Sequence, residues 1–372
     1  MRMSEVLRQL RAEQSKSIGA RPILMRRFEP FLPITEATPT LSLGEGFTPL
    51  VHARTLGRAM GCPLLFLKME GTNPTGSFKD RGMVVAVAKA LEEGAEAIIC
   101  ASTGNTSASA AAYGASAGLE VVVILPEGQI AAGKLLQAQV AGARIVGIQG
   151  NFDDALRVAR EMSENQDPDH PVTLVNSVNP HRLDGQKTGA FEVCEDLGGA
   201  PDYLSIPVGN AGNISAYWQG FSEYRAAGLV ETAPAMLGFQ AAGAAPLVIG
   251  HKVDHPETVA TAIRIGDPAS AQKALRARDE SGGRIEAVTD EEILDAYRDL
   301  ARHEGVFCEP ASAASVAGIR KLAAEGSIDP GATIVCVITG HGLKDPDTAG
   351  RNAQPIIHAE PTLAGVRRAL DW

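Results

Sequence analysis

Several kinds of functional signature are absent from this 372-residue chain. Its five cysteines are far apart and odd in number, no pair of them has zinc-ligand spacing, and the eight histidines form no HExxH-type motif. The first residues, 1–27, are charged and hold no apolar segment of the signal-peptide kind, and no later apolar run approaches membrane-spanning length. These absences predict a soluble, unexported protein without a metal site.

Charge and cysteine placement narrow the possible partners. The chain has 34 Lys and Arg against 44 Asp and Glu, a net charge of -10. This balance argues against nucleic acid or an anionic membrane as the main partner, so any anionic small ligand must be bound by local groups. Most of the cysteines are embedded in apolar runs, as in residues 97–100, which is typical of reduced core thiols in a cytoplasmic protein.

The pattern of apolar runs predicts an α/β fold with mainly parallel sheets. At 45% hydrophobic residues the chain can bury a sizeable core. From Leu64 onward, short apolar runs alternate with helical stretches of the length usual for βα units, and several runs are continuous, as in strands covered on both faces. The candidate strands are 64–67, 97–101, 121–125, 144–148, 172–175, 204–208, 235–239 and 333–338.

Two clusters of these strands suggest two open-sheet lobes, although no composition change marks a boundary. We expect a larger domain formed by residues 1–95 and 178–372, and a smaller, mobile substrate domain formed by residues 96–177. The larger domain includes an N-terminal amphipathic helix over residues 1 to about 30, followed by a Pro-containing arm; this segment serves packing or oligomer contact. Ligands of such sheets bind beyond the carboxyl ends of the strands.

Helix-end signals support this reading of the elements. Gly94 follows the helix that begins near Phe78, and Thr289 with Glu292 forms a capping box in front of an apolar run.

Lys79 lies in the segment NPTGSFKDRG, residues 73–82, at a predicted helix start. There the free backbone N–H groups and the positive end of the helix dipole disfavour an ammonium group. One interpretation is an exposed lysine paired with Asp80 or Glu70. The other is a nucleophilic amine with a lowered pKa that forms a Schiff base. The rest of the chain has to decide between them.

Two further strand-to-helix loops carry groups suited to anions. STGNTSAS, residues 102–109, holds more short polar side chains than one N-cap needs, although a cap cluster is the alternative. GNAGN, residues 209–213, has two glycines before a helix and can cradle a phosphate with its backbone N–H groups. It lacks the GxGxxG and P-loop patterns, so a small phosphate ester is favoured over a nucleotide. Its alternative is a turn capped by Asn213.

A fourth loop, TGHGLK at residues 339–344, places the hydroxyl of Thr339 at a strand end, where it can reach a flat ligand. Alone this signal is weak. A lysine in a turn, a polar loop with an amide, a phosphate loop and a strand-end hydroxyl together describe a pyridoxal phosphate site.

These motifs also carry a family resemblance. GSFKDRG, STGNTSAS, GNAGN and TGHGLKDP, with GEGFTPL at residues 44–50, resemble the tryptophan-synthase-β superfamily of pyridoxal phosphate enzymes (fold type II) and are similar to its threonine synthases. The match runs from about Gly44 to Asp347. It implies two lobes with the cofactor between them and its phosphate on the larger domain. A further family segment, EPASAA from Glu309, would line the cofactor, where Ser312 is equally well an N-cap.

The resemblance assigns roles residue by residue. Lys79 would form the Schiff base with pyridoxal 5'-phosphate and shuttle protons, Asn105 would bind the phenolic oxygen, and Thr339 would face the ring nitrogen. A hydroxyl there makes the cofactor a weaker electron sink than a carboxylate partner would, which favours elimination and replacement. The cofactor phosphate would be held by Gly209, Asn210, Ala211, Gly212 and Asn213.

The segment after residues 172–175 bears on the substrate. Arg182 offers bidentate phosphate geometry, and Asn176 and Ser177 offer neutral donors, with a solvated basic turn as the alternative. Lys134 is a further phosphate candidate, although it also fits an exposed helix position. Among the hydroxyls of the 102–109 loop, the substrate candidates are Ser102, Thr103 and Thr106.

The resemblance thus implies that O-phospho-L-homoserine and water become L-threonine and phosphate through γ-elimination and β-addition of water. A dehydratase-type lyase is the alternative enzyme, and a cofactor- or amino-acid-binding sensor is the non-enzyme alternative, against which Lys79 argues. We expect a homodimer with a small-molecule substrate, and no regulatory domain after about Asp347.

Overall fold

The structure is a computed structural model that describes residues 22–127, 132–165, 167 and 170–372, without the side chains of residues 132–134. Residues 1–21 of the helix expected to run to about residue 30 lie outside the described part of the chain. Its described end holds only the short helix α2 (Leu24–Arg27) and the 3₁₀ helix η1 (Glu29–Phe31). No helix of the described residues is long and apolar enough to cross a membrane. All five cysteines are buried and free.

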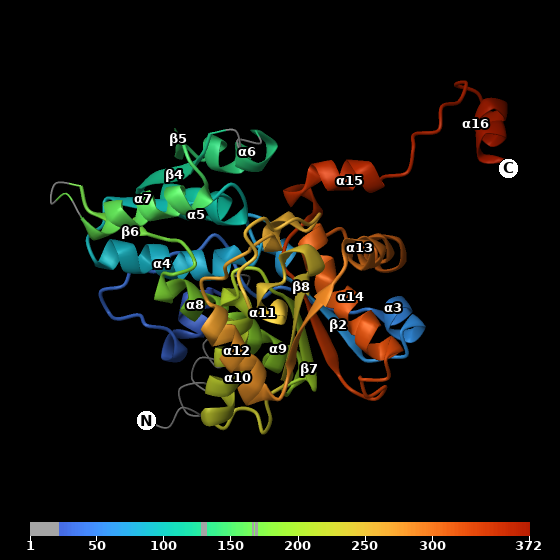
Figure 1. Cartoon of the computed structure of the whole chain (residues 1–372), viewed down its shortest axis with the longest axis horizontal. Helices are drawn as coiled ribbons and strands as arrows, with labels where there is room; N and C mark the ends of the chain where they lie inside the picture. Colours follow the sequence, from blue (N-terminus) through green and yellow to red (C-terminus); the bar gives the residue numbers. More distant parts are fainter. Residues whose placement is uncertain (1–21, 128–131, 166, 168–169) are drawn as a thin grey trace.

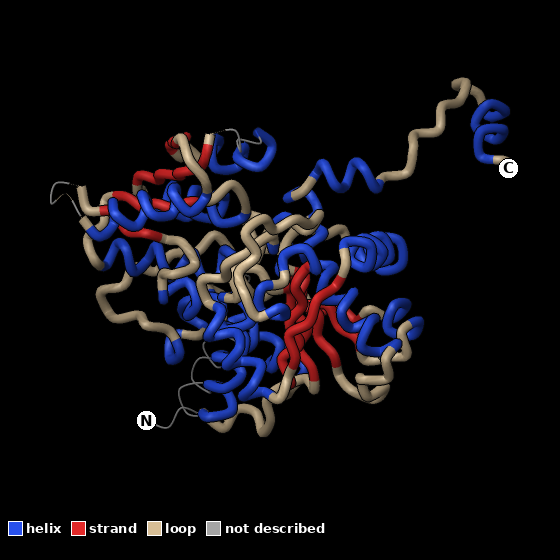
Figure 2. Tube along the Cα trace, viewed as in Figure 1, coloured by secondary structure: helices blue, strands red, loops and turns tan. Residues whose placement is uncertain are grey.

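The strands form two separate sheets, which confirms the expected α/β fold (Figure 2). The larger sheet has the order β1-β2-β10-β7-β8-β9, and only β1 runs antiparallel to its neighbour. The smaller sheet has the order β5-β4-β3-β6 and is entirely parallel. The strands are β1 (Leu50–His52), β2 (Leu65–Met69), β3 (Ala97–Ala101), β4 (Glu120–Pro126), β5 (Arg144–Ile148), β6 (Val172–Leu174), β7 (Tyr203–Pro207), β8 (Ala235–Ala241), β9 (Arg284–Val288) and β10 (Ile334–Ile338).

Helices surround both sheets and carry the connections between parallel strands (Figure 1). The α-helices are α2 (Leu24–Arg27), α3 (Arg54–Ala59), α4 (Lys79–Glu92), α5 (Asn105–Ala117), α6 (Ala132–Val140), α7 (Phe152–Glu164), α8 (Pro180–Gln186), α9 (Thr188–Leu197), α10 (Gly212–Ala226), α11 (Pro246–Ile249), α12 (Ala271–Ser281), α13 (Asp290–Glu304), α14 (Pro310–Ala324), α15 (Pro346–Asn352) and α16 (Leu363–Leu370). Short 3₁₀ helices are η1 (Glu29–Phe31), η2 (Glu70–Thr72), η3 (Ala242–Ala244), η4 (Thr261–Ile263) and η5 (Gly342–Lys344).

All eight predicted strands are present, with ends that shift by no more than two residues. Two strands, β1 and β9, were not predicted. Both lie at the edges of the larger sheet, and they lack the continuous apolar run of a strand covered on both faces. The predicted helix ends are confirmed: Gly94 follows α4 with φ +81°, and Thr289 and Glu292 form the capping box of α13.

Helix α4 connects the two halves of the molecule. It packs against α5, which covers the smaller sheet, and against α8, which lies beside the larger sheet (Figure 1). The contact with α8 depends on two glycines. A Cβ on Gly82 would lie 2.4 Å from the carbonyl oxygen of Arg182, and a Cβ on Gly185 would lie 2.0 Å from that of Arg81. The backbones of α4 and α8 therefore approach more closely than any side chain permits.

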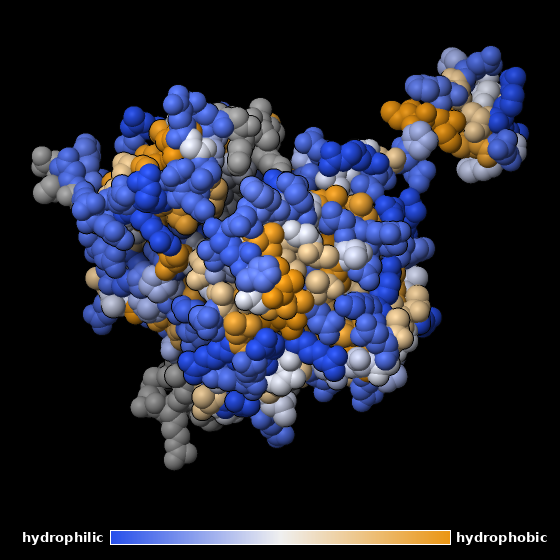
Figure 3. All heavy atoms as spheres, viewed as in Figure 1, coloured by the Kyte–Doolittle hydropathy of each residue, from blue (hydrophilic) through white to orange (hydrophobic). Residues whose placement is uncertain are grey.

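The chain ends in a segment that leaves the body of the molecule. After α15, residues 353–362 run without helix or strand to α16, which lies apart from the other elements (Figure 1). Apolar side chains of this segment, among them Ile356 and Leu363, are exposed to solvent (Figure 3).

Candidate active site

A cavity of about 230 Å³ lies at the carboxyl ends of strands from both sheets. It is lined by the loops after β3, β6, β7 and β10 and by the turn before α4. The parallel sheets bring these distant segments together, as expected for ligand sites of open α/β sheets. The predicted residues that line it are Ser102, Thr103, Thr106, Asn176 and Ser177, together with Lys79, Asn105, Gly209, Asn210, Ala211, Gly212, Asn213 and Thr339.

The turn before α4 is bonded to the loop after β10. The Phe78 N–H donates to the Thr339 carbonyl at 3.0 Å, and Ser77 and Gly340 form an isolated antiparallel bridge. Lys79 and Thr339 therefore enter the cavity from adjacent stretches of backbone.

Asp80, which follows Lys79, fixes the start of α4. Its buried carboxylate accepts hydrogen bonds from the Thr75 N–H at 2.7 Å, the Thr75 hydroxyl at 2.6 Å and the Ser109 hydroxyl at 2.6 Å. Because Ser109 belongs to α5, this carboxylate joins the lysine turn to the helix after β3.

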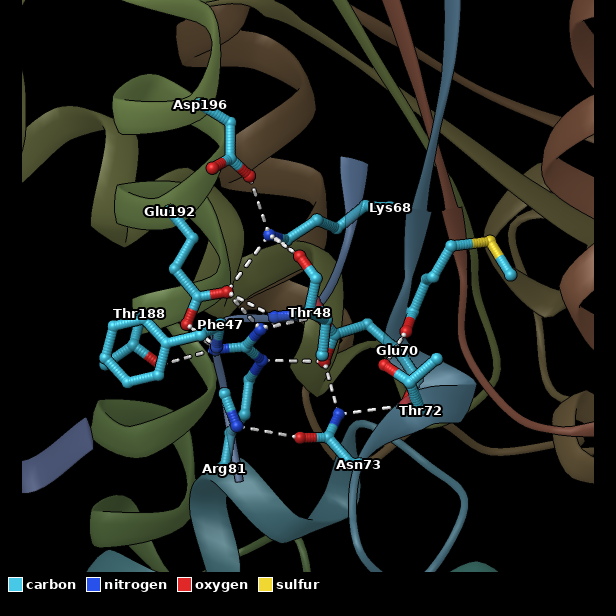
Figure 4. Close-up of polar contacts among 12 residues, drawn as sticks. Phe47, Thr48, Lys68, Glu70, Thr72, Asn73, Arg81, Thr188, Glu192 and Asp196 are labelled. Carbon is cyan, nitrogen blue, oxygen red and sulfur yellow. Dashed lines mark hydrogen bonds and ion pairs between the residues drawn. The ribbon is translucent and has the colours of Figure 1, made fainter. Parts of the chain in front are cut away.

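Arg81 anchors the same helical turn through a second set of contacts (Figure 4). Its guanidinium is fully buried between two carboxylates: it donates to Glu70 at 2.6 and 2.7 Å and to Glu192 at 2.6 Å twice. Lys68, also fully buried, pairs with Glu192 at 3.0 Å and with Asp196 at 3.1 Å. Burial raises the pKa of Glu192, but the two cations outweigh burial and hold that pKa at about 2. The network ties β2, α4 and α9 into one unit.

Lys79 itself is held by neither neighbour. Asp80 and Glu70 are occupied by the contacts just described, and no ion pair joins the Lys79 ammonium to a described residue, so the pairing interpretation is wrong. Its Nζ lies 4.4 Å from the centroid of the Phe78 ring. Burial lowers the pKa of Lys79 to about 7; the Arg182 guanidinium acts in the same direction and Glu309 opposes them. The amine is therefore available as a nucleophile near neutral pH.

The 102–109 loop does not serve as a cap cluster. Helix α5 begins at Asn105 with Gly104 at the N-cap and no side-chain cap. Two side chains of the loop make local contacts: the Ser102 hydroxyl accepts the Gly104 N–H, and the Ser107 hydroxyl donates to the Gly104 carbonyl. Ser102, Thr103, Asn105 and Thr106 of this loop line the cavity, whereas Ser109 donates to Asp80.

The 209–213 loop presents unpartnered donors. Helix α10 begins at Gly212, and Ala211, with a φ of +63°, is its N-cap, so the alternative interpretation of a turn capped by Asn213 is wrong. Within the described residues, no backbone or side-chain group accepts from the amides of 209–213. Both polar atoms of the buried Asn213 side chain also lack a partner there. A cradle with this many free N–H groups at a helix start is suited to a phosphate dianion.

Thr339, Ser312 and Glu309 form a hydrogen-bonded row at one wall. The Thr339 hydroxyl donates to Glu309 at 3.2 Å and lies 2.9 Å from the Ser312 hydroxyl. Glu309, not Ser312, is the N-cap residue of α14, so the cap interpretation of Ser312 is wrong. Asn105 donates its amide to both carboxylate oxygens of Glu309, at 3.0 and 3.3 Å.

The expected substrate residues are only partly brought together. Asn176 faces the cavity, but its amide makes two bonds of 2.9 Å with the backbone of Ala101. Arg182 is fully buried beside the cavity and does not line it; one N–H donates to the Val175 carbonyl, and Nε and Nη2 have no partner among the described residues. The side chain of Lys134 lies outside the described part of the structure.

Sequence reasoning missed several cavity residues. Lys344 lies in the TGHGLK loop that was singled out for Thr339, and Glu309 lies in the segment singled out for Ser312. The stretch 261–265, which includes Arg264, has no regular pattern that could have placed it in the cavity.

Comparisons with known proteins agree with this geometry. The family model described as pyridoxal-phosphate dependent enzyme matches residues 41–340. Among curated proteins, threonine synthase of Halalkalibacterium halodurans is 60% identical over 88% of this chain and 90% of the relative. That of Synechocystis is 55% identical over 94% and 91%, and that of Methanocaldococcus jannaschii is 50% identical over 95% and 89%.

Solved structures show the same fold at lower identity. Tomato threonine deaminase isoform 2 has a TM-score of 0.69 at 22% identity, covering 82% of this chain and 83% of its own. Maize serine racemase has a TM-score of 0.70 at 20% identity, covering 88% and 94%. The chain thus belongs to the pyridoxal-phosphate dependent enzymes of fold type II and, within them, to the threonine synthase family.

Proposed function

We propose that this protein converts O-phospho-L-homoserine and water into L-threonine and phosphate. Family membership makes it a pyridoxal-phosphate dependent lyase with a small-molecule substrate. The observation that carries the substrate assignment is the presence of two separate groups of donors that have no acceptor among the described residues. They are the 209–213 amides in the cavity wall and Nε and Nη2 of Arg182, which is buried beside the cavity. A phosphorylated substrate needs a second phosphate site besides that of the cofactor, whereas a dehydratase needs only the first.

The residues present fit the cofactor. The 209–213 amides and Asn213 would hold its phosphate, Asn105 its phenolic oxygen, Thr339 its ring nitrogen and Lys79 its aldehyde carbon. When bound, pyridoxal phosphate withdraws electrons from the substrate carbons so that protons leave them more readily. Because Thr339 offers a hydroxyl to the ring, the site favours reactions in which a leaving group shares the electron demand.

Lys79 supplies the acid–base chemistry. With a pKa of about 7, its Nζ can accept a proton from the α-carbon and give one back at neutral pH. The anchored residues Asp80 and Arg81 hold the backbone from which Lys79 reaches the cavity. Phosphate leaves from the γ-carbon and water adds to the β-carbon.

Arg182, Asn176 and Ser177 are the proposed partners of the substrate phosphate. Two buried N–H groups of Arg182 lack an acceptor, which costs free energy unless a ligand provides one. The side chains of Ser102, Thr103 and Thr106 line the same cavity and suit the substrate carboxylate. Lys134 remains a candidate for the substrate phosphate.

The two sheets support the proposed domains, with residues 96–177 as a smaller unit that moves over the cavity. Helix α6 of this smaller unit contacts the larger domain. Its Gln137 side chain accepts a hydrogen bond from Lys344 and donates one to the Thr75 carbonyl at 3.4 Å. We further propose a homodimer in the cytoplasm. Five buried, free thiols are consistent with a reducing compartment.

The direct test incubates the purified protein with pyridoxal phosphate and O-phosphohomoserine and measures phosphate and threonine together. We expect equal amounts of both. If neither appears while threonine yields 2-oxobutyrate, the protein is a dehydratase instead. The variant Arg182→Ala should lose turnover but retain borohydride-trappable cofactor, and unchanged kinetics would remove Arg182 from the site.

A further inference from the structure

Glu309 is a buried carboxyl in the cavity wall to which the proposed reaction gives no part. It is 4% exposed. Its two oxygens accept from the Asn105 amide, and Oε1 also accepts from the Thr339 hydroxyl at 3.2 Å. Asn105 and Thr339 are the side chains proposed to bind the cofactor's phenolic oxygen and ring nitrogen. One carboxylate therefore holds both donors of the cofactor ring.

The hydroxyl of Thr339 has a single proton, so it cannot donate to Glu309 and to a ring nitrogen at once. The Ser312 hydroxyl accepts the Gly340 N–H at 3.0 Å, and its own proton has two acceptors in reach: Thr339 at 2.9 Å and the Gly340 carbonyl at 3.4 Å. Because Thr339 gives its proton to Glu309, the shorter contact runs from Ser312 to Thr339. Hydrogen bonds in this row are therefore donated in one direction, from Ser312 to Thr339 and from Thr339 to Glu309. A ring that takes the Thr339 proton removes a donor from Glu309.

Few positive charges lie close to Glu309 to offset the burial of its carboxylate. No ion pair joins it to a described cation, although Lys79 of α4 and Lys344 of η5 lie near enough to favour its charged form. The adjacent thiol of Cys308 is buried and brings no positive charge. Burial raises the pKa of Glu309, while Asn105 and Thr339 oppose burial by hydrogen bonding. Losing the Thr339 donor shifts the balance towards the protonated form of Glu309.

The carboxyl also has no free space on the backbone side. A Cβ on Gly340 would lie 2.5 Å from Oε1 and 2.6 Å from Cδ. Glu309 thus stays against Thr339 when the donors turn to a ligand.

We propose that Glu309 holds Asn105 and Thr339 in place in the cofactor-free protein and takes up one proton when the cofactor ring becomes their acceptor. The protonated carboxyl then donates from its oxygen to Thr339 Oγ1, whose own proton points to the ring. This positioning role rests on the cofactor assignment of the proposed function. It makes cofactor affinity depend on pH through a residue that need not touch the substrate.

The direction of the pH dependence follows from the coupling between proton binding and cofactor binding. A carboxyl whose pKa is higher in the complex than in the free protein binds a proton on association. Affinity is then greatest at low pH and falls as pH rises above the pKa of free Glu309, until pH passes the pKa in the complex. Between these limits the dissociation constant increases about tenfold per pH unit.

The experiment uses pyridoxine 5'-phosphate, which has an alcohol in place of the aldehyde, so that Lys79 forms no bond to it. Its dissociation constant from the cofactor-free full chain is measured by calorimetry across neutral pH for the wild type and Glu309→Gln. The ring and phosphate of the probe titrate alike in both. We expect the wild type to show the steeper dependence by close to one proton, and Glu309→Gln to bind more tightly at the alkaline end.

Ser312→Ala is the matched control, because it removes a partner of Thr339 but keeps the carboxyl. We expect weaker binding with the wild-type pH slope. A second readout is infrared difference spectroscopy: probe binding should produce a protonated-carboxyl band in the wild type that Glu309→Gln lacks, and circular dichroism checks that the variants fold.

Equal pH slopes in the wild type and Glu309→Gln, or no carboxyl band in the wild type, would overturn the proposal. The threonine and phosphate assay shows whether a failure concerns Glu309 or the proposed function. Threonine formation with equal slopes rejects the role of Glu309 alone. Unequal slopes without threonine formation support Glu309 and reject the substrate assignment.

Discussion

Three consecutive charged residues, Lys79, Asp80 and Arg81, have sharply different environments. Asp80 and Arg81 are buried and fully engaged, whereas Lys79 faces the cavity without an ion-pair partner among the described residues. The contacts of Asp80 and Arg81 thus fix the backbone of this helix turn, and the Lys79 side chain remains free to react. This division explains why an ammonium stands at the unfavourable end of a helix.

Lys79 gives the first prediction. Because its pKa is lowered to about 7, its neutral fraction increases as pH rises through 7, and so does the rate of reaction with pyridoxal phosphate in the cofactor-free protein. Stopped-flow absorbance at a series of pH values measures this rate. Lys79→Ala should show no covalent phase, and a midpoint near the ordinary lysine pKa would contradict the assigned environment.

Sequence patterns, together with the family resemblance, singled out Lys79, Asn105, Thr339 and the 209–213 loop, and all of them line the cavity. Each lies in a loop after a predicted strand that differs in composition from an ordinary turn. Glu309 could not be identified in the same way. Its significance comes from two partners, Asn105 and Thr339, that are 204 and 30 positions away in the chain. No local pattern reports such a contact.

At the level of elements, the crossing of α4 and α8 positions both Lys79 and Arg182. Substituting Gly185 by Ala puts a methyl group 2.0 Å from the Arg81 carbonyl, so the two helices must separate. We expect a loss of about 1–3 kcal/mol or more in the free energy of unfolding, as for other overpacked sites.

Denaturant titration measures this loss, and Gly350→Ala is a suitable control because a Cβ there meets nothing within 4 Å. An equal effect of both substitutions would contradict the role given to the helix crossing.

The charge network at Arg81 provides a further prediction. Arg81→Met leaves Glu70 and Glu192 buried without their main partner, and breaking such a pair costs about 3–5 kcal/mol. Arg157→Met, which removes exposed pairs on α7, should change stability little. Denaturant unfolding of the cofactor-free proteins compares them, and equal losses would show that the buried network adds no particular stability.

The same network predicts a response to acid. The pKa of Glu192 is about 2 in the folded protein, below its ordinary value of 4.5, so its contribution is complete above about 4.5 and is lost as pH falls towards 2. Glu192→Gln should be less stable at neutral pH and should lose less stability on acidification. Unfolding measured at several pH values tests both; parallel curves for the two proteins would count against it.

Considering the whole molecule, the alternation of buried apolar runs and helices was enough to predict both sheets. The strands covered on both faces, such as β3 and β10, have every residue buried and stand out in the sequence. Edge strand β9 contains Arg284 and Glu286 and has only two buried residues, so its sequence resembles the polar segments around it. The N-terminal arm and the proposed mobility of residues 96–177 stay predictions.

The C-terminal segment yields a prediction for the assembly. Helix α16 has eight residues and lies apart from the body, yet isolated helices of this length are marginal in water. We expect removal of residues 353–372 to leave the unfolding midpoint of the body unchanged and to weaken the proposed homodimer. Analytical ultracentrifugation of both chains tests this; a truncated chain that remains fully dimeric would place the contact elsewhere.

The amides of residues 209–213, which have no acceptor in the described part of the chain, have a practical consequence for handling the protein. A cradle built for a phosphate ester also accepts inorganic phosphate, which is released in the proposed reaction. In the cofactor-free protein, phosphate and sulfate in a buffer should compete with pyridoxal phosphate and slow its uptake, and neutral buffers of equal ionic strength should not. Accumulated product would then delay the reloading of enzyme molecules that have lost their cofactor, while leaving loaded ones unaffected.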